Sequence, residues 1–394
     1  MGETSGHLGA RPKRVFFYVQ HLLGIGHLVR ASRIANALNE AGMDVTLVTG
    51  GNKIDGFPAA NVRHVQLPPV FAASSGFSGL ADEQGHKIDD AFKAMRKARL
   101  LEAFEKAAPD AVLIEAFPFG RRQMHFELLP LMEAIEASNP RPLLFSSVRD
   151  ILQENRKAGR DEETVTLAKR YFDGVLVHGD ESFVRLEETF PLAREIAERV
   201  HYTGLVAPDE PAPATDHFDV VVSAGGGAVG ASVLQASLEA CKILADRRSW
   251  LLIAGPNMPA EDFERLNADA PETVTIVRFR RDFSNLLMNA QVSISQAGYN
   301  TVGDLLRARC ACVLLPFSSG GETEQTVRAE KLQALGFAEM VTEDELTGES
   351  LALAIRRATE PGKARPALAL SLDGARQTAA LIDRLVAEKR STAG

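Results

Sequence analysis

Cysteine is scarce in this chain of 394 residues, which has only Cys241, Cys310 and Cys312. So few thiols provide neither a disulfide framework nor the four ligands of a structural zinc site. We therefore expect three small, buried thiols without a role in chemistry. No DxD motif is presented as a metal site either, so the sequence favours a function that needs no metal ion and no cofactor.

The chain also lacks an excess of basic residues and long apolar runs. Its formal net charge is -8 and its pI is about 5.7, which argues against a general nucleic-acid-binding protein. No apolar run is long enough to cross a membrane, and the first residues, MGETSGHLGARPKR, lack the apolar segment of a signal peptide. We expect a cytoplasmic protein with a flexible amino terminus over residues 1–13.

Short apolar runs alternate with segments of helical period along most of the chain. A first series comprises RVFFYV, DVTLVTG, NVRHVQL, DAVLIEA, RPLLFSSV and DGVLVHG, and a second comprises DVVVSAG, SWLLIAG, TVTIVR, QVSISQAG and ACVLLPF. This alternation is typical of parallel sheets covered by helices on both faces. With 45% hydrophobic residues, the chain can bury two such cores.

The two series are separated by VAPDEPAPATDHF, which is rich in proline and acidic residues and suits an extended linker. The sequence therefore predicts an α/β protein with two Rossmann-like domains, at residues 14–205 and 218–365, joined by a linker at 206–217. Residues 366–394 read as a final helix. The carboxyl ends of both sheets would then meet at a shared cleft.

The segment from 292 to 332 predicts a strand, a turn, a helix, a strand and a Gly-rich loop in succession. Gly298 permits a positive φ, and the helix that begins near Asn300 and Thr301 presents unpaired backbone N–H groups that could hold a phosphate. One helical turn in, Asp304 could accept hydrogen bonds from two vicinal hydroxyls of a ribose. Glu324 and Gln325 could hold further hydroxyls.

A second Gly-rich turn follows the strand that ends at Ser223. Gly225, Gly226 and Gly227 are small enough to let backbone N–H groups approach a diphosphate. The alternative is a tight turn between a strand and a helix, with no ligand. The sequence leaves both open.

His27 lies in GIGH, directly after the first strand and at the start of a helix. A neutral histidine there could remove a proton from an acceptor hydroxyl. Glu115 and Asp150 also end strands and are alternative general bases. Pairing with Arg121 or Arg149 would instead make either carboxylate structural.

The stretch HKIDDAFKAMRKARLLEAFEKA carries Lys93, Arg96, Lys97 and Arg99 on a predicted amphipathic helix. Such a helix could contact an anionic membrane at the inner face. A solvated outer helix with ordinary charge pairs, such as Glu102 with Lys106, is the simpler interpretation.

Three elements in order resemble glycosyltransferase family 28: GIGHLVRASRIANAL from Gly24, VVVSAGGGAVGASVLQASLEA from Val220, and the segment from 292 to 332. The resemblance implies the GT-B architecture, in which the second domain holds a nucleotide-sugar and the first holds the acceptor. It also implies a final helix that crosses back to the first domain. Donor-binding candidates are then Gly225, Gly226, Gly227, Phe279, Arg280, Gly298, Tyr299, Asn300, Thr301, Asp304, Glu324 and Gln325. Acceptor-side candidates are Gly24, Gly26, Arg121 and Arg149.

The chain departs from the family pattern at two donor positions. Asp304 replaces a longer Glu, and Glu324 with Gln325 replaces a Gln pair, so the donor sugar stays open. The resemblance implies an inverting transfer from a UDP-sugar to a hydroxyl on a glycan or lipid, with the departing UDP stabilised by helix ends instead of a metal ion. GIGHLVR also resembles a loop of nucleotide-sugar hydrolases, so water is an alternative acceptor. A non-catalytic nucleotide-sugar sensor is the third hypothesis.

Overall fold

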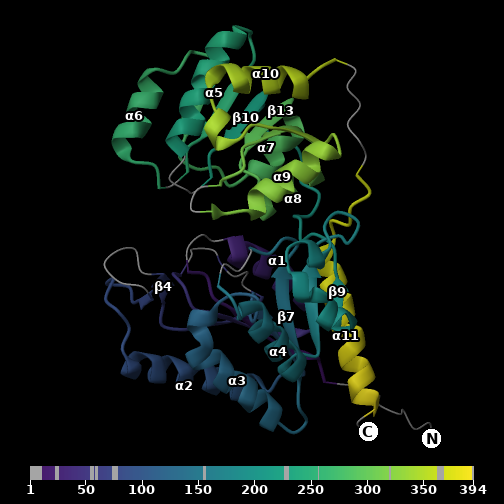
Figure 1. Cartoon of the computed structure of the whole chain (residues 1–394). Coiled ribbons are helices and arrows are strands. Elements are labelled where there is room, and N and C mark those ends of the chain that lie inside the picture. Colours follow the sequence, from purple (N-terminus) through teal and green to yellow (C-terminus); the bar gives the residue numbers. More distant parts are fainter. Residues whose placement is uncertain are drawn as a thin grey trace, which may run out of the picture.

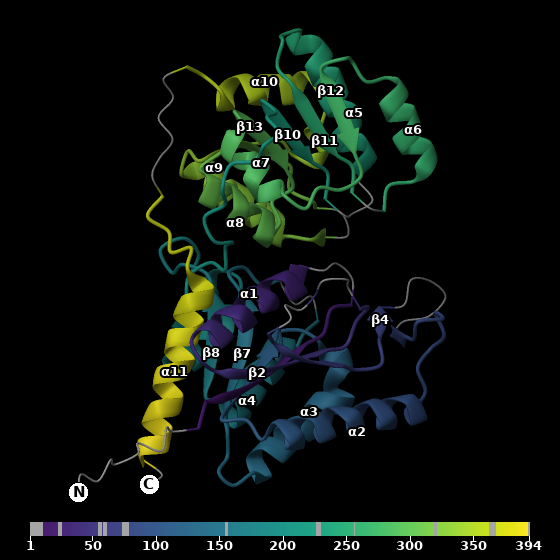
Figure 2. The same cartoon turned by 180° about the vertical axis from the view of Figure 1, so that it is seen from behind.

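The computed structural model describes residues 11–392 except 23–25, 54–56, 58–60, 73–78, 154–156, 226–229, 256, 319–320 and 362–367. Within these residues the chain forms two parallel sheets, each sandwiched between helices and stacked one above the other (Figure 1). The reverse view shows α11 running down the side of the lower domain (Figure 2). The fold is therefore α/β with two Rossmann-like domains, as predicted.

The amino-terminal sheet has the strand order β3-β2-β1-β6-β7-β8-β9, and all of its pairs are parallel. Successive residues of β1 alternate between two cores, because side chains of a strand point to opposite faces. Phe17 packs with α1 and α11, whereas Phe16 packs with α2 and α3. The strands are β1 (Arg14–Val19), β2 (Asp44–Thr49), β3 (Arg63–Gln66), β6 (Ala111–Glu115), β7 (Leu143–Arg149), β8 (Gly174–His178) and β9 (Val200–Tyr202). The helices are α1 (Gly26–Glu40), α2 (Asp90–Ala107), α3 (His125–Ala137), α4 (Arg160–Tyr171) and α11 (Gly374–Thr392), with short 3-10 turns η1 (Arg122–Met124), η2 (Leu186–Glu188) and η3 (Pro191–Arg199).

The carboxyl-terminal sheet repeats this plan with the order β12-β11-β10-β13-β14-β15. Val220 packs with α5 and α10 on one face, and Val221 packs with α7, α8 and α9 on the other. The three cysteines are free and buried in these two cores, as predicted. The strands are β10 (Val220–Ser223), β11 (Trp250–Ile253), β12 (Val274–Val277), β13 (Val292–Ser295), β14 (Ala311–Leu314) and β15 (Ala338–Met340). The helices are α5 (Gly230–Leu244), α6 (Ala260–Ala268), α7 (Phe283–Asn289), α8 (Tyr299–Ala308), α9 (Glu324–Ala334), α10 (Gly348–Ala358) and the 3-10 turn η5 (Glu343–Glu345).

Every strand of the two predicted series is present. Sequence reasoning missed the short strands β4 (Phe71–Ala72), β5 (Leu80–Ala81), β9 and β15. These strands have only two or three residues, and β9 is half-buried throughout, so they lack the apolar run that marks the others.

The strand order creates a topological switch point in each sheet. β1 lies between β2 and β6, and β10 lies between β11 and β13, so the connections that follow adjacent strands diverge there. Ligands of open parallel sheets bind outside such a point. The helices that follow β1 and β13, α1 and α8, contact each other, and the Asn300 side-chain amide donates to the Gly26 carbonyl at 3.1 Å. The two switch points therefore face each other.

The chain passes between the domains next to this contact. The Val206 N–H donates to the Tyr299 hydroxyl at 2.8 Å, and Val206 forms an isolated bridge with Asp373, just before α11. From there α11 packs along α1. The last helix thus supports α1, the helix whose second residue is His27.

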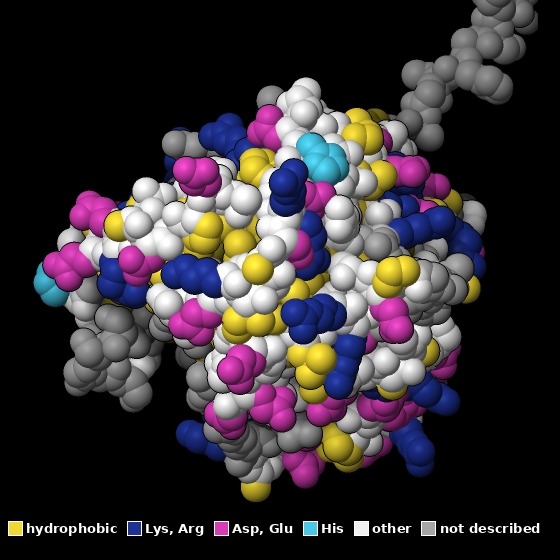
Figure 3. Space-filling model, turned by 90° about the horizontal axis from the view of Figure 1, so that it is seen from above, with side chains coloured by type: hydrophobic (Ala, Val, Ile, Leu, Met, Phe, Trp, Pro, Cys, Tyr) yellow, Lys and Arg dark blue, Asp and Glu magenta, His cyan; other side chains and the backbone are white. Residues whose placement is uncertain are grey.

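The upper surface of the carboxyl-terminal domain shows Lys and Arg interspersed with Asp and Glu, without a field of one sign (Figure 3). Among the described residues, no helix is both long enough and apolar enough to span a bilayer.

Candidate functional site

His27, the second residue of α1, is held by a carboxylate from the end of β6. Its Nδ1 lies 3.0 Å from Glu115 Oε1, and the guanidinium of Arg30, one turn further along α1, donates to the same oxygen. Glu115 and Arg30 are fully buried, whereas about a fifth of the His27 side chain is exposed (21%). Within the described part of the chain, no hydrogen bond reaches Nε2 of His27. The imidazole is therefore held in place through Nδ1, whereas Nε2 has no hydrogen-bond partner among the described residues.

The charges around this pair keep His27 neutral and Glu115 ionised. Burial lowers the pKa of His27 to about 4, and Arg121 and Arg30 act in the same direction, while Glu115 opposes them. Burial alone would raise the pKa of Glu115, but Arg30 and the hydrogen bond with His27 hold it well below its ordinary value. A neutral histidine with a free nitrogen can accept a proton.

The carboxylate of Glu115 is itself anchored from the other side. Its Oε2 accepts from the Ser147 hydroxyl at 2.8 Å, and Ser147 Oγ lies 2.9 Å from His178 Nε2. His178 Nδ1 lies 2.9 Å from Thr203 Oγ1. All of these side chains are buried. Glu115 therefore has both oxygens occupied and no route to a bound hydroxyl, which disfavours it as the general base.

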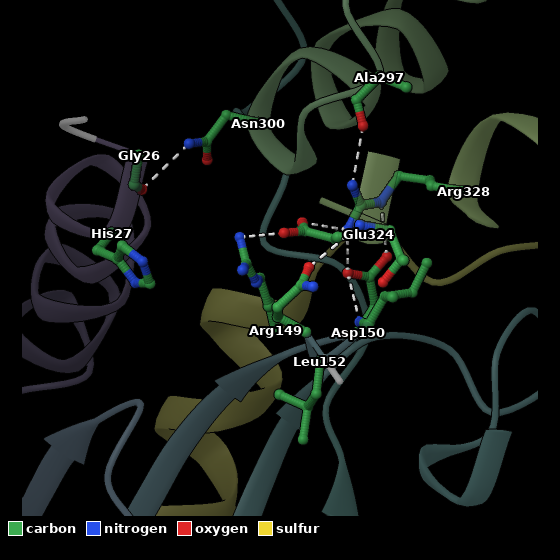
Figure 4. Close-up of polar contacts among 12 residues, drawn as sticks. Gly26, His27, Arg149, Asp150, Leu152, Ala297, Asn300, Glu324 and Arg328 are labelled. Carbon is green, nitrogen blue, oxygen red and sulfur yellow. Dashed lines mark hydrogen bonds and ion pairs between the residues drawn. The ribbon is translucent and has the colours of Figure 1, made fainter. Parts of the chain in front are cut away.

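Asp150 is placed differently from the prediction. Its oxygens accept from Arg328 Nε at 3.0 Å and Nη2 at 2.6 Å, and both side chains are fully buried. Arg328 comes from α9, so this is an ion pair between the two domains, shown in Figure 4. A carboxylate that neutralises a buried guanidinium is not available to take a proton. Asp150 is thus an interdomain anchor, and its predicted candidacy as a base is disfavoured.

Glu324 joins the same network. One of its oxygens accepts from Arg328 at 2.7 Å, and the other is paired with Arg149 at the end of β7. Its side chain is 4% exposed. Both oxygens of this carboxylate are paired with arginines, so the predicted sugar hydroxyls would have to share them with Arg328 and Arg149. Its neighbour Gln325 is half-buried and accepts from the Phe317 N–H at 3.2 Å.

Sequence reasoning missed Arg30 and Arg328, the actual partners of Glu115 and Asp150. It proposed pairing with Arg121 or Arg149 instead. A signal was present in each helix: Arg30 lies three residues after His27, and Arg328 lies four residues after Glu324. Side chains at these spacings share a helix face.

Arg121 lies near His27 without a carboxylate in direct contact among the described residues. Its Nε donates to the Gln20 carbonyl at 2.7 Å, and its backbone is left-handed with φ 62°. Burial lowers its pKa, and Arg149 and Arg30 add to that effect. In Figure 4, His27 and Arg149 lie on opposite sides of the space below Asn300. Arg121 and Arg30 therefore place positive charge close enough to His27 to lower its pKa.

The amino terminus of α8 is the predicted phosphate site. Gly298 precedes the helix with φ -66° and ψ 149°, so the prediction of a positive φ is wrong: the residue is extended. The Tyr299 side chain points into the domain interface, where its hydroxyl donates to the His178 carbonyl at 2.8 Å. Only the backbone of Tyr299 is then available to a donor. The half-buried Asn300 and Thr301 continue the first turn.

Asp304 lies one turn into α8 and is 9% exposed. Burial raises its pKa, and Arg33 of α1, whose Nη2 lies 3.4 Å from Oδ1, partly offsets this effect. The Asp304 carboxylate also has a side-chain hydrogen bond with Ser284, and it retains acceptor capacity for hydroxyls.

The Gly-rich turn after β10 is only partly described. Gly225 has φ 71°, a conformation that favours glycine, and a Cβ there would displace the Gln296 side chain, whose Oε1 would lie 2.4 Å away. Gly226 and Gly227, like Gly24 in the first domain, lie outside the described residues. Gly26 begins α1, and a Cβ on it would approach Asn300 Nδ2 to 3.2 Å.

The predicted base pocket follows β12. Phe279 is 62% exposed, a large apolar ring left uncovered at the carboxyl end of a strand. Arg280 is bound to Asp282 and Asp216, with its Nη2 at 2.7 and 2.9 Å from their carboxylates. Arg280 is therefore occupied, whereas its neighbour Arg281 is exposed.

On α2, Arg96 is not available to contact a membrane surface. Its side chain is fully buried and bonds Glu127 and Gln20, because α2 turns this residue into the core. Lys93 instead pairs with Asp90, and Lys106 pairs with Glu102, at the surface. Of the four basic residues predicted on this helix, Arg96 therefore lies in the core and Lys93 lies at the surface.

Residues His, Cys, Asp and Glu do not gather in groups of three or more that could hold a metal ion anywhere in the described ranges.

Residues 221–382 match the glycosyltransferase family 28 C-terminal domain. Among curated proteins, the chain is 33% identical over 147 residues to the UDP-N-acetylglucosamine–N-acetylmuramyl-(pentapeptide) pyrophosphoryl-undecaprenol N-acetylglucosamine transferase of Myxococcus xanthus, covering 36% of this chain and 38% of the relative. It is 28% identical over 181 residues to the enzyme of the same name from Thermotoga neapolitana, covering 46% of this chain and 51% of the relative. The chain thus aligns with about half or less of these relatives' length.

Solved structures resemble the whole chain. The calicheamicin glycosyltransferase CalG4 superposes with a TM-score of 0.62 and 16% identity, covering 96% of this chain and 98% of that one. MurG of Acinetobacter baumannii superposes with a TM-score of 0.60 and 16% identity, covering 95% of this chain and all of that one (100%). At this identity the likeness concerns the fold. The chain therefore has the GT-B fold, and its residues 221–382 match the C-terminal domain of glycosyltransferase family 28.

Proposed function

We propose that this protein is an inverting glycosyltransferase that moves a sugar from a UDP-sugar to an acceptor hydroxyl, with His27 as the general base. The observation that carries the proposal is the orientation of His27 by Glu115 at the topological switch point that faces α8. The curated relatives bear the name of a UDP-N-acetylglucosamine transferase, so this donor is the first to test.

In the proposed reaction, the acceptor oxygen attacks the anomeric carbon while its proton moves to Nε2 of His27. The bond from the anomeric carbon to the diphosphate oxygen breaks, and its electron pair leaves with UDP. Because attack and departure occur on opposite sides, the anomeric configuration inverts. Glu115 stabilises the imidazolium that forms, as an ionised carboxylate beside Nδ1 does.

The donor would lie against the second domain. Backbone N–H groups at the start of α8, near Asn300 and Thr301, would face the diphosphate, where the positive end of the helix dipole favours negative charge. Asp304 would accept the ribose hydroxyls, and the exposed ring of Phe279 would stack on the base. We propose that these groups stabilise the leaving UDP without a metal ion.

For the acceptor, the proposal rests only on the chemical character of the side chains around His27. Arg121 places positive charge near His27, Arg149 lies near Arg121, and a hydroxyl on a glycan or lipid would approach Nε2 of His27. A peripheral position at a membrane surface is compatible with a lipid acceptor, but Arg96 has no part in it because that side chain is buried.

Calorimetry with UDP, GDP, dTDP, CMP and NAD, without added metal, tests the donor site first. Selective binding of UDP is the expected result. Turnover of UDP-N-acetylglucosamine is then followed with hydroxyl acceptors and with water alone, with and without a chelator, and product NMR reports the anomeric configuration. His27→Ala should lower turnover about 100-fold or more, whereas the matched variant His86→Ala, at a side chain 79% exposed on the far side of β5, should not.

Rapid release of the sugar into water without an acceptor would identify a hydrolase instead. Binding of UDP without turnover of any donor would support a sensor. Normal turnover by His27→Ala would remove His27 from the role of base, and failure to bind any nucleotide would overturn the proposal as a whole.

A further inference from the structure

The buried side chains behind His27 form a chain of hydrogen bonds that the proposed reaction does not use directly. The chain runs from Thr203 through His178 and Ser147 to Glu115, and from Glu115 to His27. Its four contacts are 2.9, 2.9, 2.8 and 3.0 Å long. Except for His27, every member is at most 2% exposed. These residues come from β6, β7 and β8, from the segment after β9, and from α1.

The hydrogens in this chain can be placed in only one way, starting from Glu115. An ionised carboxylate only accepts hydrogen bonds, so Ser147 must donate its single hydrogen to Oε2 and His27 must donate from Nδ1 to Oε1. Arg30 donates to the same carboxylate, and its Nη2 lies 3.4 Å from His27 Nδ1. A lone pair on Nδ1 would face the negative Oε1 at 3.0 Å, which is repulsive.

The remaining links follow. Because the hydrogen of Ser147 is used, its Oγ can only accept from His178, so His178 carries its hydrogen on Nε2. His178 is then an acceptor at Nδ1, and Thr203 donates to it at 2.9 Å in preference to the Val177 carbonyl at 3.5 Å. Burial lowers the pKa of His178 to about 3, with Arg30 acting in the same direction and Glu115 against it, so the ring is neutral as this order requires.

We infer that Ser147, His178 and Thr203 are positioning residues that fix His27 as the tautomer with hydrogen on Nδ1 and its lone pair on Nε2. The inference rests on the proposed function for its catalytic meaning. The lone pair then lies on Nε2, which has no hydrogen bond from a described residue and where a bound hydroxyl would approach. Without the chain, Glu115 would have a free oxygen and could rotate away from His27.

Because every hydrogen bond in this chain has one fixed direction, less free energy is needed to bring His27 into the tautomer and orientation that the reaction requires. A histidine in water samples both tautomers and many ring angles, whereas this ring begins each cycle with the required nitrogen free. The polar groups of the chain are also mutually satisfied, which is the condition under which a buried network is tolerated.

Tautomers can be read directly by long-range ¹H–¹⁵N NMR of the ¹⁵N-labelled full chain, with His27→Gln and His178→Gln spectra used for assignment. The expected result at neutral pH is a hydrogen on Nδ1 of His27 and on Nε2 of His178. The opposite tautomer at either ring in the unaltered protein overturns the inference. This readout requires no turnover, so it separates the inference from the proposed function.

Kinetics test the positioning role with matched variants. Thr203→Val keeps the shape but removes the donor, and Thr203→Ser restores it. We expect Thr203→Val and Ser147→Ala to lower kcat roughly 10- to 100-fold with little change in KM for the donor, and Thr203→Ser to stay close to the unaltered protein.

The pH profile provides a second readout that a merely structural role would not move. The charged groups facing His27 are Glu115, Arg30 and Arg121, from β6, α1 and the segment after β6. Ser147→Ala removes a donor from Glu115, so the carboxylate should attract the imidazolium more strongly and shift the acid limb of kcat/KM upward. An unshifted limb together with unchanged kcat in Ser147→Ala and Thr203→Val would refute the positioning role. If the unaltered protein turns over no nucleotide-sugar, the proposed function fails, and the NMR spectra still decide the tautomers.

Discussion

The protonation of His27 offers a direct check on the geometry of the site. The ordinary pKa of histidine is about 6.5, and burial next to Arg121 and Arg30 lowers that of His27 to about 4. At pH 5 about 97% of an ordinary imidazole would be protonated, against about 10% for one with this lowered pKa. The neutral base should therefore persist well below neutral pH.

The assay is an NMR titration of the His27 ring between pH 8 and 5, with the unfolded protein in denaturant as the reference. The His27 signal should stay almost constant over this range, while the reference titrates near 6.5. The acid limb of kcat/KM should likewise lie near pH 4. A midpoint between 6 and 7 in the folded protein would refute the reasoning, because it would mean that His27 is solvated as in a peptide.

The same shift carries a consequence for stability, whose sign is fixed by proton binding. Below pH 6.5 the unfolded chain binds a proton at His27 that the folded chain does not bind until about pH 4. The stabilisation is therefore fully present above pH 6.5 and is lost as the pH falls. The free energy of unfolding should decrease by about 1.4 kcal/mol per pH unit for this group, and His27→Gln should show a smaller decrease in urea titrations at pH 5 and 7.

Three further outcomes are expected. Asp304→Ala should weaken UDP binding by roughly 1 to 3 kcal/mol in calorimetry through loss of charge-assisted hydrogen bonds, and an unchanged affinity would exclude the ribose contact. Phe279→Ala should weaken it by about 1 to 3 kcal/mol through lost stacking while leaving the melting temperature unchanged, since the ring is 62% exposed. Asp150→Ala should destabilise the fold by about 3 to 5 kcal/mol in urea because Arg328 stays buried, whereas Glu102→Ala, which breaks an exposed pair, should leave the urea midpoint almost unchanged. Equal effects of these two changes would show that the interdomain pair is hydrated.

The sequence by itself determined the order of strands and helices, because buried parallel strands are continuous apolar runs that stand out from the helices between them. It also placed His27, Glu115 and Asp150 at strand ends. A parallel sheet brings all of its strand carboxyl ends to one edge, so these positions follow from the order of elements alone.

Only the tertiary structure decided which carboxylate belongs to which cation. Arg30 and Arg328 reach Glu115 and Asp150 from helices that are distant in the sequence. Because Arg328 belongs to the second domain, its ion pair with Asp150 links the two domains. Ion pairs and tautomers depend on distances of a few ångströms between segments 85 and 178 residues apart, and no local pattern in a sequence encodes such distances.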